Sequence, residues 1–429
     1  MKKIAALLLL SAAPAFAQDP AGHDGHAPAA RMDHSQHGAM AMPDSAMKGA
    51  LGPYAMAREA SGTSWQPDAA PHDGIHLPDT GDWMVMVHAR VIGVLDSQSG
   101  PRGDSMAFAT GMAMGMASRE LPGGGTLALR GMLSLDPFMG KRGYPLLLAA
   151  GETADGVTHL VNRQHPHELV MEMSASVSQP LSDSSSLFLY VGYPGEPALG
   201  PGAYMHRASG LDSPATPISH HWLDSTHITF GVLTAGFVHD RWKFEVSQFT
   251  GREPDQFRFD FDEARFDSTA LRLTFNPTAN WSLQASIGWL KSPEGLHPAD
   301  NEQRITASAS WFEAFDFGTL AATIAIGSKR LSDGESTHAL LLETTWKPDA
   351  DWSLFLRGEH IESGELVPEP GIFGAGDLTM GLVRDFALSE NWKIGLGGLY
   401  AFKFAPSSAI APYGGGPRGA MAFVRLVAQ

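Results

Sequence analysis

Histidine and methionine are the residues of this chain whose types and clustering could do chemistry. The 429 residues include 18 histidines and 19 methionines but no cysteine. Thioether sulfur prefers the cuprous ion and imidazole accepts either oxidation state of copper, so the two together suit this metal. The first group comprises His23, His26, Met32, His34, His37, Met40, Met42 and Met47. Its density predicts a copper-binding segment; the alternative is a low-complexity linker in which these residue types are incidental.

A second group of candidate ligands lies in two stretches farther along the chain. These ligands are His165, His167, Glu168, His206, His220, His221, Asp224 and His227. If the two stretches fold together, neutral imidazoles and carboxylates converge as ligands for a transition metal. Histidines that only hydrogen-bond within ordered loops are the alternative, and the sequence favours neither.

Methionines also recur in the first predicted strands. Met84 and Met86 share a face with His88, and Met132 shares one with Arg130. Because polar residues mark the inner side of a barrel, these methionines are predicted to face inward, where thioethers would suit copper or silver. Packing without metal is the favoured alternative. A further set shares one face of the next strand, with its direction left open: Met112, Met114 and Met116.

The elements that must position these residues are strands. In residues 281–290 apolar side chains such as Leu283 and Ile287 alternate with polar ones such as Gln284. This period of two, with one apolar and one polar face, is typical of a barrel that crosses an outer membrane. Short turns are each followed by tryptophan, as in an interfacial aromatic girdle. The marked positions are Trp242, Trp281, Trp352 and Trp392.

Counting such strands gives the fold class. About 16 strands fit between residue 82 and residue 429, an even number as single-chain barrels require. Short turns alternate with long connections, of which residues 138–167 and 194–226 carry the second group of ligands. We therefore predict an all-β, transmembrane, antiparallel up-and-down β-barrel with long extracellular loops and periplasmic termini.

The amino terminus predicts export. Lys2 and Lys3 precede an apolar run over residues 4–13, and Ala15-Phe16-Ala17 fits a cleavage site, so residues 1–17 are predicted to be a signal peptide. Residues 18–80 are poor in aromatic and β-branched side chains, which predicts a disordered, Met/His-rich periplasmic segment. The predicted location is the outer membrane.

Two resemblances accompany these patterns. Residues 18–80 are called the leader below. Over about residues 23–56 it resembles the Met/His-rich leader of outer-membrane copper-resistance proteins of the B type. The strings Gly-Glu-Thr-Ala-Asp-Gly at 151–156 and Arg-Gln-His-Pro-His at 163–167 resemble those of uncharacterised exported bacterial barrels. The first resemblance implies a role in copper tolerance, and the second implies no activity.

The net charge of −16 argues against a nucleic-acid partner. The leading hypothesis is an outer-membrane barrel that binds or exports copper-like transition-metal ions, in contact with membrane lipid and with periplasmic metal-efflux partners. A general or solute-specific porin without metal function is the alternative. A lipase-like hydrolase using Ser225 and His227 is less favoured, because the sequence has no Gly-x-Ser-x-Gly elbow, and the chain is not expected to be an enzyme.

Overall fold

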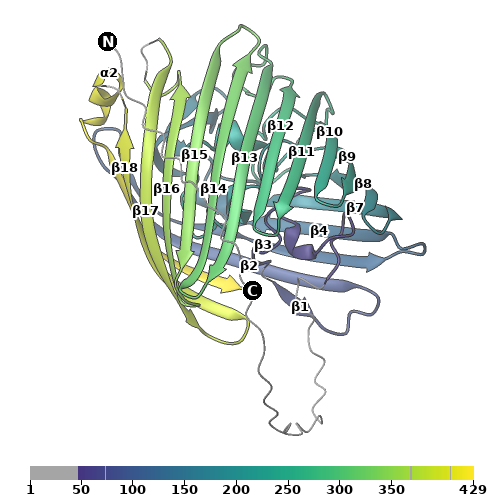
Figure 1. Ribbon diagram of the computed structural model, residues 1–429. Coiled ribbons are helices and arrows are strands. Elements are labelled where there is room, and N and C mark those ends of the chain that lie inside the picture. Colours follow the sequence, from purple (N-terminus) through teal and green to yellow (C-terminus); the bar gives the residue numbers. More distant parts are fainter. Residues whose placement is uncertain (1–46, 73, 368–369, 406) are drawn as a thin grey trace, which may run out of the picture. The chain divides into compact units, whose positions relative to one another are not determined.

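Sixteen long strands form a closed antiparallel barrel (Figure 1). The computed structural model describes residues 47–72, 74–367, 370–405 and 407–429. Each strand pairs with its neighbours in chain order, and the barrel closes where β19 pairs with β2. The wall comprises β2 (Met84–Gln98), β3 (Ser105–Glu120), β4 (Thr126–Ser134), β7 (Val170–Ser182), β8 (Ser185–Gly192), β9 (Val232–His239), β10 (Trp242–Phe249), β11 (Ser268–Thr278), β12 (Trp281–Leu290), β13 (Glu302–Phe315), β14 (Gly318–Leu331), β15 (Ser336–Lys347), β16 (Trp352–Ser363), β17 (Phe373–Ala387), β18 (Trp392–Phe404) and β19 (Arg418–Ala428). The predicted fold class is confirmed.

The alternation read from the sequence separates an apolar exterior from a polar interior. In β10, Trp242 and Phe244 are 38% and 50% exposed, whereas Lys243 and Glu245 between them are buried. The other strands repeat this arrangement, so large apolar side chains cover the outside of the wall and ionisable ones line the lumen. An exterior of this kind suits a lipid bilayer. The closed barrel exposes no unpaired strand edge to the hydrocarbon, and few charged side chains lie on its outer face. None of the helices in the described ranges is long and apolar enough to cross a bilayer.

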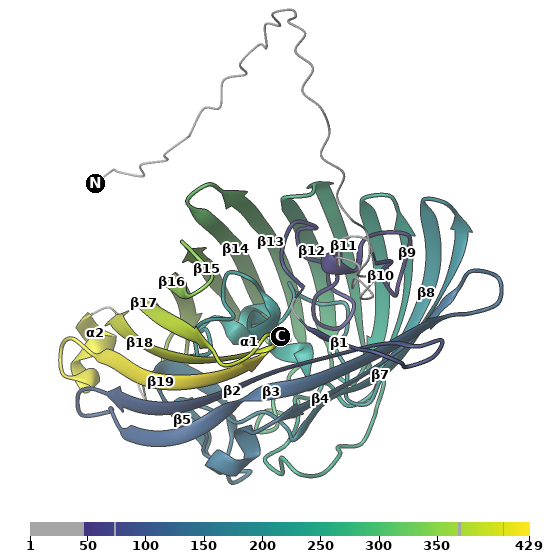
Figure 2. The same cartoon turned by 90° about the horizontal axis from the view of Figure 1, so that it is seen from below.

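The long connections fold into the lumen. The connection between β4 and β7 contains η3 (Asp136–Met139) and a small two-stranded sheet of β5 (Tyr144–Thr153) and β6 (His159–Gln164). The connection between β8 and β9 contains η4 (Tyr204–His206), α1 (His220–Leu223) and η5 (Ser225–His227). Figure 2 shows α1 inside the ring of strands. Smaller elements occur near the two ends of the chain: η2 (Met56–Arg58), β1 (Ile75–Leu77), α2 (Ser407–Ile410) and η6 (Ala411–Tyr413).

The leader is ordered over much of the range predicted to be disordered. Tyr54 and Trp65 are buried with Phe188 and Val238 of the wall, and Arg58 pairs with Asp68 at 2.6 Å. The interior wall also supplies hydrogen-bond partners for the leader backbone, which composition alone does not reveal. These are Ser178 and Ser186, which donate to the carbonyls of Ala50 and Leu51, and Arg130, which donates to that of Gly62. The predicted disorder over residues 18–80 is therefore corrected for residues 47–72 and 74–80, which the structure places against the wall; residues 18–46 lie outside the described ranges.

We expect the Trp65→Ala substitution to release this ordered part of the leader. Trp65 is 6% exposed, and Lys243 of β10 lies 4.7 Å from the centre of its ring. Loss of a buried Trp costs about 3–5 kcal/mol, so local opening should become frequent. Trypsin cutting after the buried Arg58 reports this opening directly. Cleavage there should accelerate by more than about tenfold, as expected for proteolysis through a local opening.

The matched control for this experiment is Phe138→Ala, because Phe138 is an aromatic residue that is 70% exposed. Equal cleavage rates in wild type and Trp65→Ala would contradict the docking of the leader through Trp65.

Candidate metal centre

Three of the predicted ligands meet in the lumen. His167, His220 and His227 each offer one ring nitrogen, and the three nitrogens all lie within 4.8 Å of one another. The side chains are deeply buried, with exposures of 6%, 1% and 6%. Nitrogens that bind one tetrahedral zinc ion at about 2.0–2.1 Å are about 3.4 Å apart. Closing on an ion would thus take side-chain movements on the order of 1 Å.

Both long connections contribute to the three-histidine cluster. His167 follows β6, whereas His220 begins α1 and His227 ends η5. The single turn of α1 places His220 and Asp224, four residues apart, on one face. The backbone N–H of His227 then donates to the Asp224 carbonyl, which returns the chain toward the same point. Sequence reasoning could name the residues but not this local turn.

Each ring is oriented by a hydrogen bond at Nδ1. His167 Nδ1 donates to Asp136 Oδ2 at 2.8 Å, and His220 Nδ1 donates to Asp224 Oδ1 at 2.8 Å. His227 Nδ1 donates to the backbone oxygen of Asp224 at 2.7 Å. Carboxylate or carbonyl acceptors at one ring nitrogen fix the tautomer and leave Nε2 with its lone pair, as at metal-binding histidines.

The Nε2 atoms of His167 and His227 are buried and have no hydrogen-bond partner among the described residues. A buried polar atom left in this state costs about 1–3 kcal/mol. Histidines with a purely structural role would leave this cost unexplained, whereas a bound ion would remove it. The orphaned nitrogens therefore favour the metal-binding interpretation of this cluster over the alternative of hydrogen-bonding histidines.

Burial keeps two of these rings neutral. It lowers the pKa of His220 and lowers that of His227 well below the usual value. Burial by itself would raise the pKa of Asp224, but Arg207 and His220 outweigh it and hold this pKa below its usual range. A neutral imidazole beside an ionised carboxylate is the protonation state that binds a cation.

Arg207 fastens the cluster to the barrel wall. Its Nη1 donates to Asp224 Oδ2 at 2.7 Å, and its Nε donates to Glu343 Oε1 of β15 at 2.6 Å. Tyr204 packs its ring against those of His220 and His227, with centroids 5.6 and 6.4 Å away, and covers one side of the site. Arg207, Tyr204 and Asp136 were not predicted, because only the folded loops bring them to the histidines.

The remaining candidate ligands make other contacts, although His221 lies beside His220, with ring centroids 5.6 Å apart. His165 contacts Glu152 at 3.1 Å and His221 lies 3.7 Å from Glu253. The Glu168 carboxylate forms a salt bridge with Arg258, 2.9 Å away. His206 lies beside His88, with ring centroids 6.2 Å apart.

Of the candidate ligands in the leader, Met47 lies within the described residues and the others do not. Met47 is described, and its carbonyl accepts a hydrogen bond from Met56 N at 2.9 Å. The other leader ligands lie outside the described residues: His23, His26, Met32, His34, His37, Met40 and Met42.

The residues considered for a hydrolase are held in other contacts. Ser225 Oγ donates to Glu253 Oε1 at 3.2 Å and accepts from Arg304 Nη1 at 2.8 Å. His227 uses Nδ1 on the Asp224 carbonyl. A serine activated by histidine needs a ring nitrogen of that histidine within hydrogen-bond reach, and the described contacts of Ser225 Oγ go to Glu253 and Arg304 instead.

No protein-family model and no curated protein sequence matches this chain. Solved structures resemble its fold. Salmonella typhi OmpF in complex with daunomycin has a TM-score of 0.53 and 11% identity, over 82% of this chain and 100% of that chain. OmpT, an outer membrane protein of Vibrio cholerae, has a TM-score of 0.47 and 8% identity, over 82% of this chain and 100% of that one. An anion-selective porin from Comamonas acidovorans has a TM-score of 0.45 and 13% identity, over 80% and 99%.

At these identities the likeness to OmpF shows the fold alone. The chain has the fold of outer-membrane β-barrels. What fills the lumen must be argued from the residues of this chain.

We expect the Arg207→Ala substitution to destabilise the lumen strongly. It would leave the buried carboxylates of Asp224 and Glu343 without their shared cation. Breaking a buried pair by removing one partner costs about 3–5 kcal/mol, so the free energy of unfolding should fall by about that amount in a urea titration of the detergent-solubilised barrel. Arg142→Ala, at an exposed arginine, is the control; if both variants unfold like wild type, Arg207 does not anchor the loop.

Proposed function

We propose that this protein is an outer-membrane barrel that holds a copper-like transition-metal ion in its lumen. The observation that carries this proposal is the convergence of His167, His220 and His227, two of them with buried Nε2 atoms that lack a partner among the described residues. The apolar exterior of the wall supports the location in the outer membrane.

The donor set favours particular ions. Three imidazoles are ligands for copper, zinc or nickel, and among divalent ions of the first row copper binds most tightly to a given nitrogen site. A fourth position on the ion would remain for water or another ligand, as at zinc sites with three protein ligands.

The role that fits is metal tolerance. The His- and Met-rich residues 18–46 would bind periplasmic ions, and the barrel would anchor this segment at the membrane. Periplasmic metal-efflux proteins stay the predicted class of partner. Catalysis is not part of the proposal.

We expect the full-length barrel to bind one Cu(II) ion tightly at the three-histidine cluster. Replacing the three histidines together with alanine should abolish this site, and Asp136→Asn should weaken it by about 10–100-fold, as the loss of an outer-shell partner typically does. Electron paramagnetic resonance of the copper-loaded protein should show coupling to imidazole nitrogens, and the triple variant should lose the part of this signal that belongs to one ion. Copper held by the leader histidines stays in both proteins and cancels in the difference spectrum.

His239→Ala is the matched control, since the His239 side chain is 54% exposed. If the triple variant and wild type bind the same number of Cu(II) ions with the same spectrum, the cluster is not a metal site. In cells, a deletion strain should lose copper tolerance and regain it with wild type but not with the triple variant.

A porin is the second candidate, and the likeness in fold to OmpF favours it. An open channel of 16 strands would be wide enough for water. Here the leader and the two long connections occupy the lumen, and cavities described inside it measure about 130 Å³ and 50 Å³. Residues of the long connection between β8 and β9 line both cavities, so loop side chains fill part of the space that an open porin leaves to water.

We therefore expect wild-type barrels in planar bilayers to conduct at least about tenfold less than an open porin of similar strand number, since only an unfilled barrel of this size has an aqueous channel. The Trp65→Ala variant, which frees the leader, should conduct more than wild type, whereas Phe138→Ala should not. Wild-type conductance equal to that of an open porin would favour the porin and count against a filled lumen.

A further inference from the structure

A methionine cluster lines the lumen beside the three-histidine cluster. Six of its methionines are buried and two are partly buried, so it holds eight of the 19 in the chain. Its members are Met84, Met86, Met112, Met114, Met116, Met132, Met171 and Met205, and Ile228 completes it. Inner positions elsewhere on the wall carry Ser, Thr, Glu and Arg together with Val, Leu, Ile and Phe. The concentration of thioethers is thus local to β2, β3 and β4, joined by Met171 of β7 and Met205 of η4.

Strand pairing assembles the thioethers in rows across the wall. Met86 pairs with Met116, and His88 pairs with Met114. On the other side of β3, Met114 pairs with Met132. Directly opposed residues of antiparallel strands have Cβ atoms about 4.5–5.5 Å apart, so their side chains meet on the same face. The direction of the β3 methionines, which the sequence left open, is inward.

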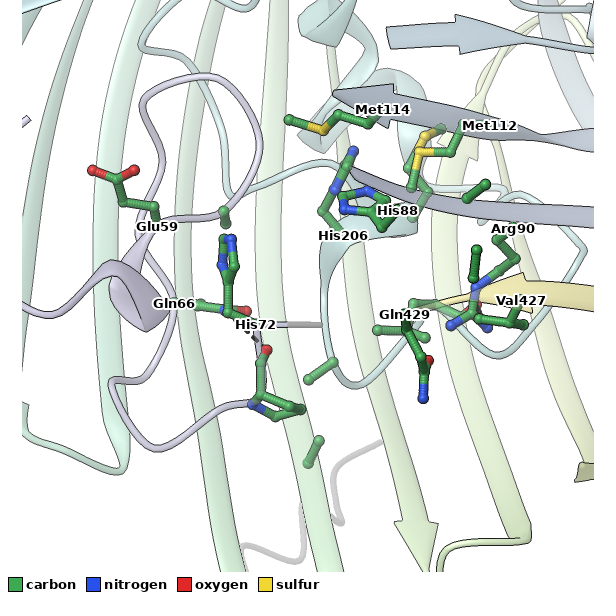
Figure 3. Close-up of a pocket in the computed structure, with 18 of the residues that line it drawn as sticks. Glu59, Gln66, His72, His88, Arg90, Met112, Met114, His206, Val427 and Gln429 are labelled. Carbon is green, nitrogen blue, oxygen red and sulfur yellow. Dashed lines mark hydrogen bonds between the residues drawn. The ribbon is translucent and has the colours of Figure 1, made fainter. Parts of the chain in front are cut away.

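Histidines from two other parts of the chain complete the surroundings. A cavity of about 130 Å³ is lined by Met112, Met114, Met116 and Met205, together with His72, His88 and His206. Figure 3 shows Met112 and Met114 beside the rings of His88 and His206. The Nε2 atoms of His72 and His206 are buried and have no hydrogen-bond partner among the described residues.

We propose that this methionine–histidine cavity binds a soft monovalent cation, Cu(I) or Ag(I). Thioether sulfur is a soft, uncharged ligand that selects these ions over Zn(II) and Cu(II), and imidazole can add to it. The guanidinium groups of Arg90 and Arg130 also line the cavity and repel cations. Their repulsion grows with the charge of the ion, which favours a monovalent one.

The charges of these arginines are partly balanced. Arg90 lies 3.1 Å from Asp212, and Arg130 lies 3.9 Å from Glu172. Lys347 also lines the cavity and, with Arg425, shares the Asp212 carboxylate with Arg90. Glu59 also lines the cavity, and one of its carboxylate oxygens has no hydrogen-bond partner in the described part of the chain. A single positive charge can therefore enter without leaving a large net charge buried.

The cavity continues toward the three-histidine cluster. Met112 and Met205 also line a second cavity of about 50 Å³, whose wall includes Met171 and His167. A soft ion held by thioethers would thus lie next to the imidazole site. The soft-ion site deepens the proposed metal function but consists of different ligands, so each site can fail independently.

The test uses full-length protein labelled with ¹³C at its methionine methyl groups. Silver is the probe, because Ag(I) needs no reductant. One equivalent of Ag(I) added beyond the leader's capacity should shift the methyl signals of Met112, Met114 and Met116, assigned by single Met→Leu substitutions, which change core volume little. Zn(II) should leave those signals in place. Silver that shifts only signals outside the cluster would overturn the proposal.

Affinity gives the second measurement. Replacing Met112, Met114 and Met116 together with leucine should lower the affinity for Ag(I) by at least about tenfold, as expected when soft ligands are removed from a soft ion. Met380→Leu on β17, where Met380 is 43% exposed, is the matched control. The variant without the three ligating histidines should keep the silver-induced shifts. If it loses Cu(II) but keeps silver, the two sites are independent. If it loses silver, the methionine–histidine cavity is not a separate site and the proposal is overturned.

Discussion

Arg207 lies between two buried carboxylates, Asp224 on a loop and Glu343 on the barrel wall. This bridge determines what the rest of the lumen can do. Asp224 uses its other oxygen to orient His220 and its backbone carbonyl to orient His227. The Glu343 carboxylate on β15 is thereby linked, through the Arg207 guanidinium and Asp224, to His220 and His227. These histidines supply two of the three nitrogens of the proposed metal site. Loop histidines are precise only when something rigid holds the loop, and here the rigid element is the sheet.

The same principle holds for the whole interior. Lipid-facing barrels place apolar side chains outside, so their interiors cannot rely on hydrophobic burial alone. Ion pairs supplement the buried apolar cluster across the lumen. Examples are Arg272 with Glu245 at 2.8 Å, Lys403 with Asp377 at 2.5 Å, and Arg425 with both Asp385 and Asp212. Such pairs add little net stability compared with an apolar core, but breaking one is costly, so they specify a single arrangement of the loops. A site that must orient imidazoles benefits from this specificity.

The barrel could be predicted from the sequence because its pattern is local. Alternation and turn-tryptophan pairs predicted about 16 strands, and predicted β12 over residues 281–290, the bounds that the structure gives. The ordered part of the leader could not be predicted, because Trp65 and Arg58 are stabilised by Lys243, Asp240 and other wall residues far away in the chain. For the proposed site, the sequence named the three histidines that converge in the lumen, and it also named His165, His206 and His221, which make other contacts. Asp136 and Arg207 escaped prediction because only tertiary contacts reveal what they orient.

The arrangement of the two proposed sites follows from how each ligand type can be built. Methionines need no partner, so a β-sheet can present them in rows, and β2 to β4 do so with alternate residues. An imidazole that binds a metal through one nitrogen needs a hydrogen-bond acceptor at the other. Successive side chains of a strand point to opposite faces of the sheet, so a neighbouring residue seldom supplies that acceptor. Turns such as α1 and η5 bring acceptor and ring within four residues of each other, so the histidine site belongs on the inserted loops. The wall would therefore hold the soft ion and the loops the harder one, with Met112 and Met205 along the boundary between them.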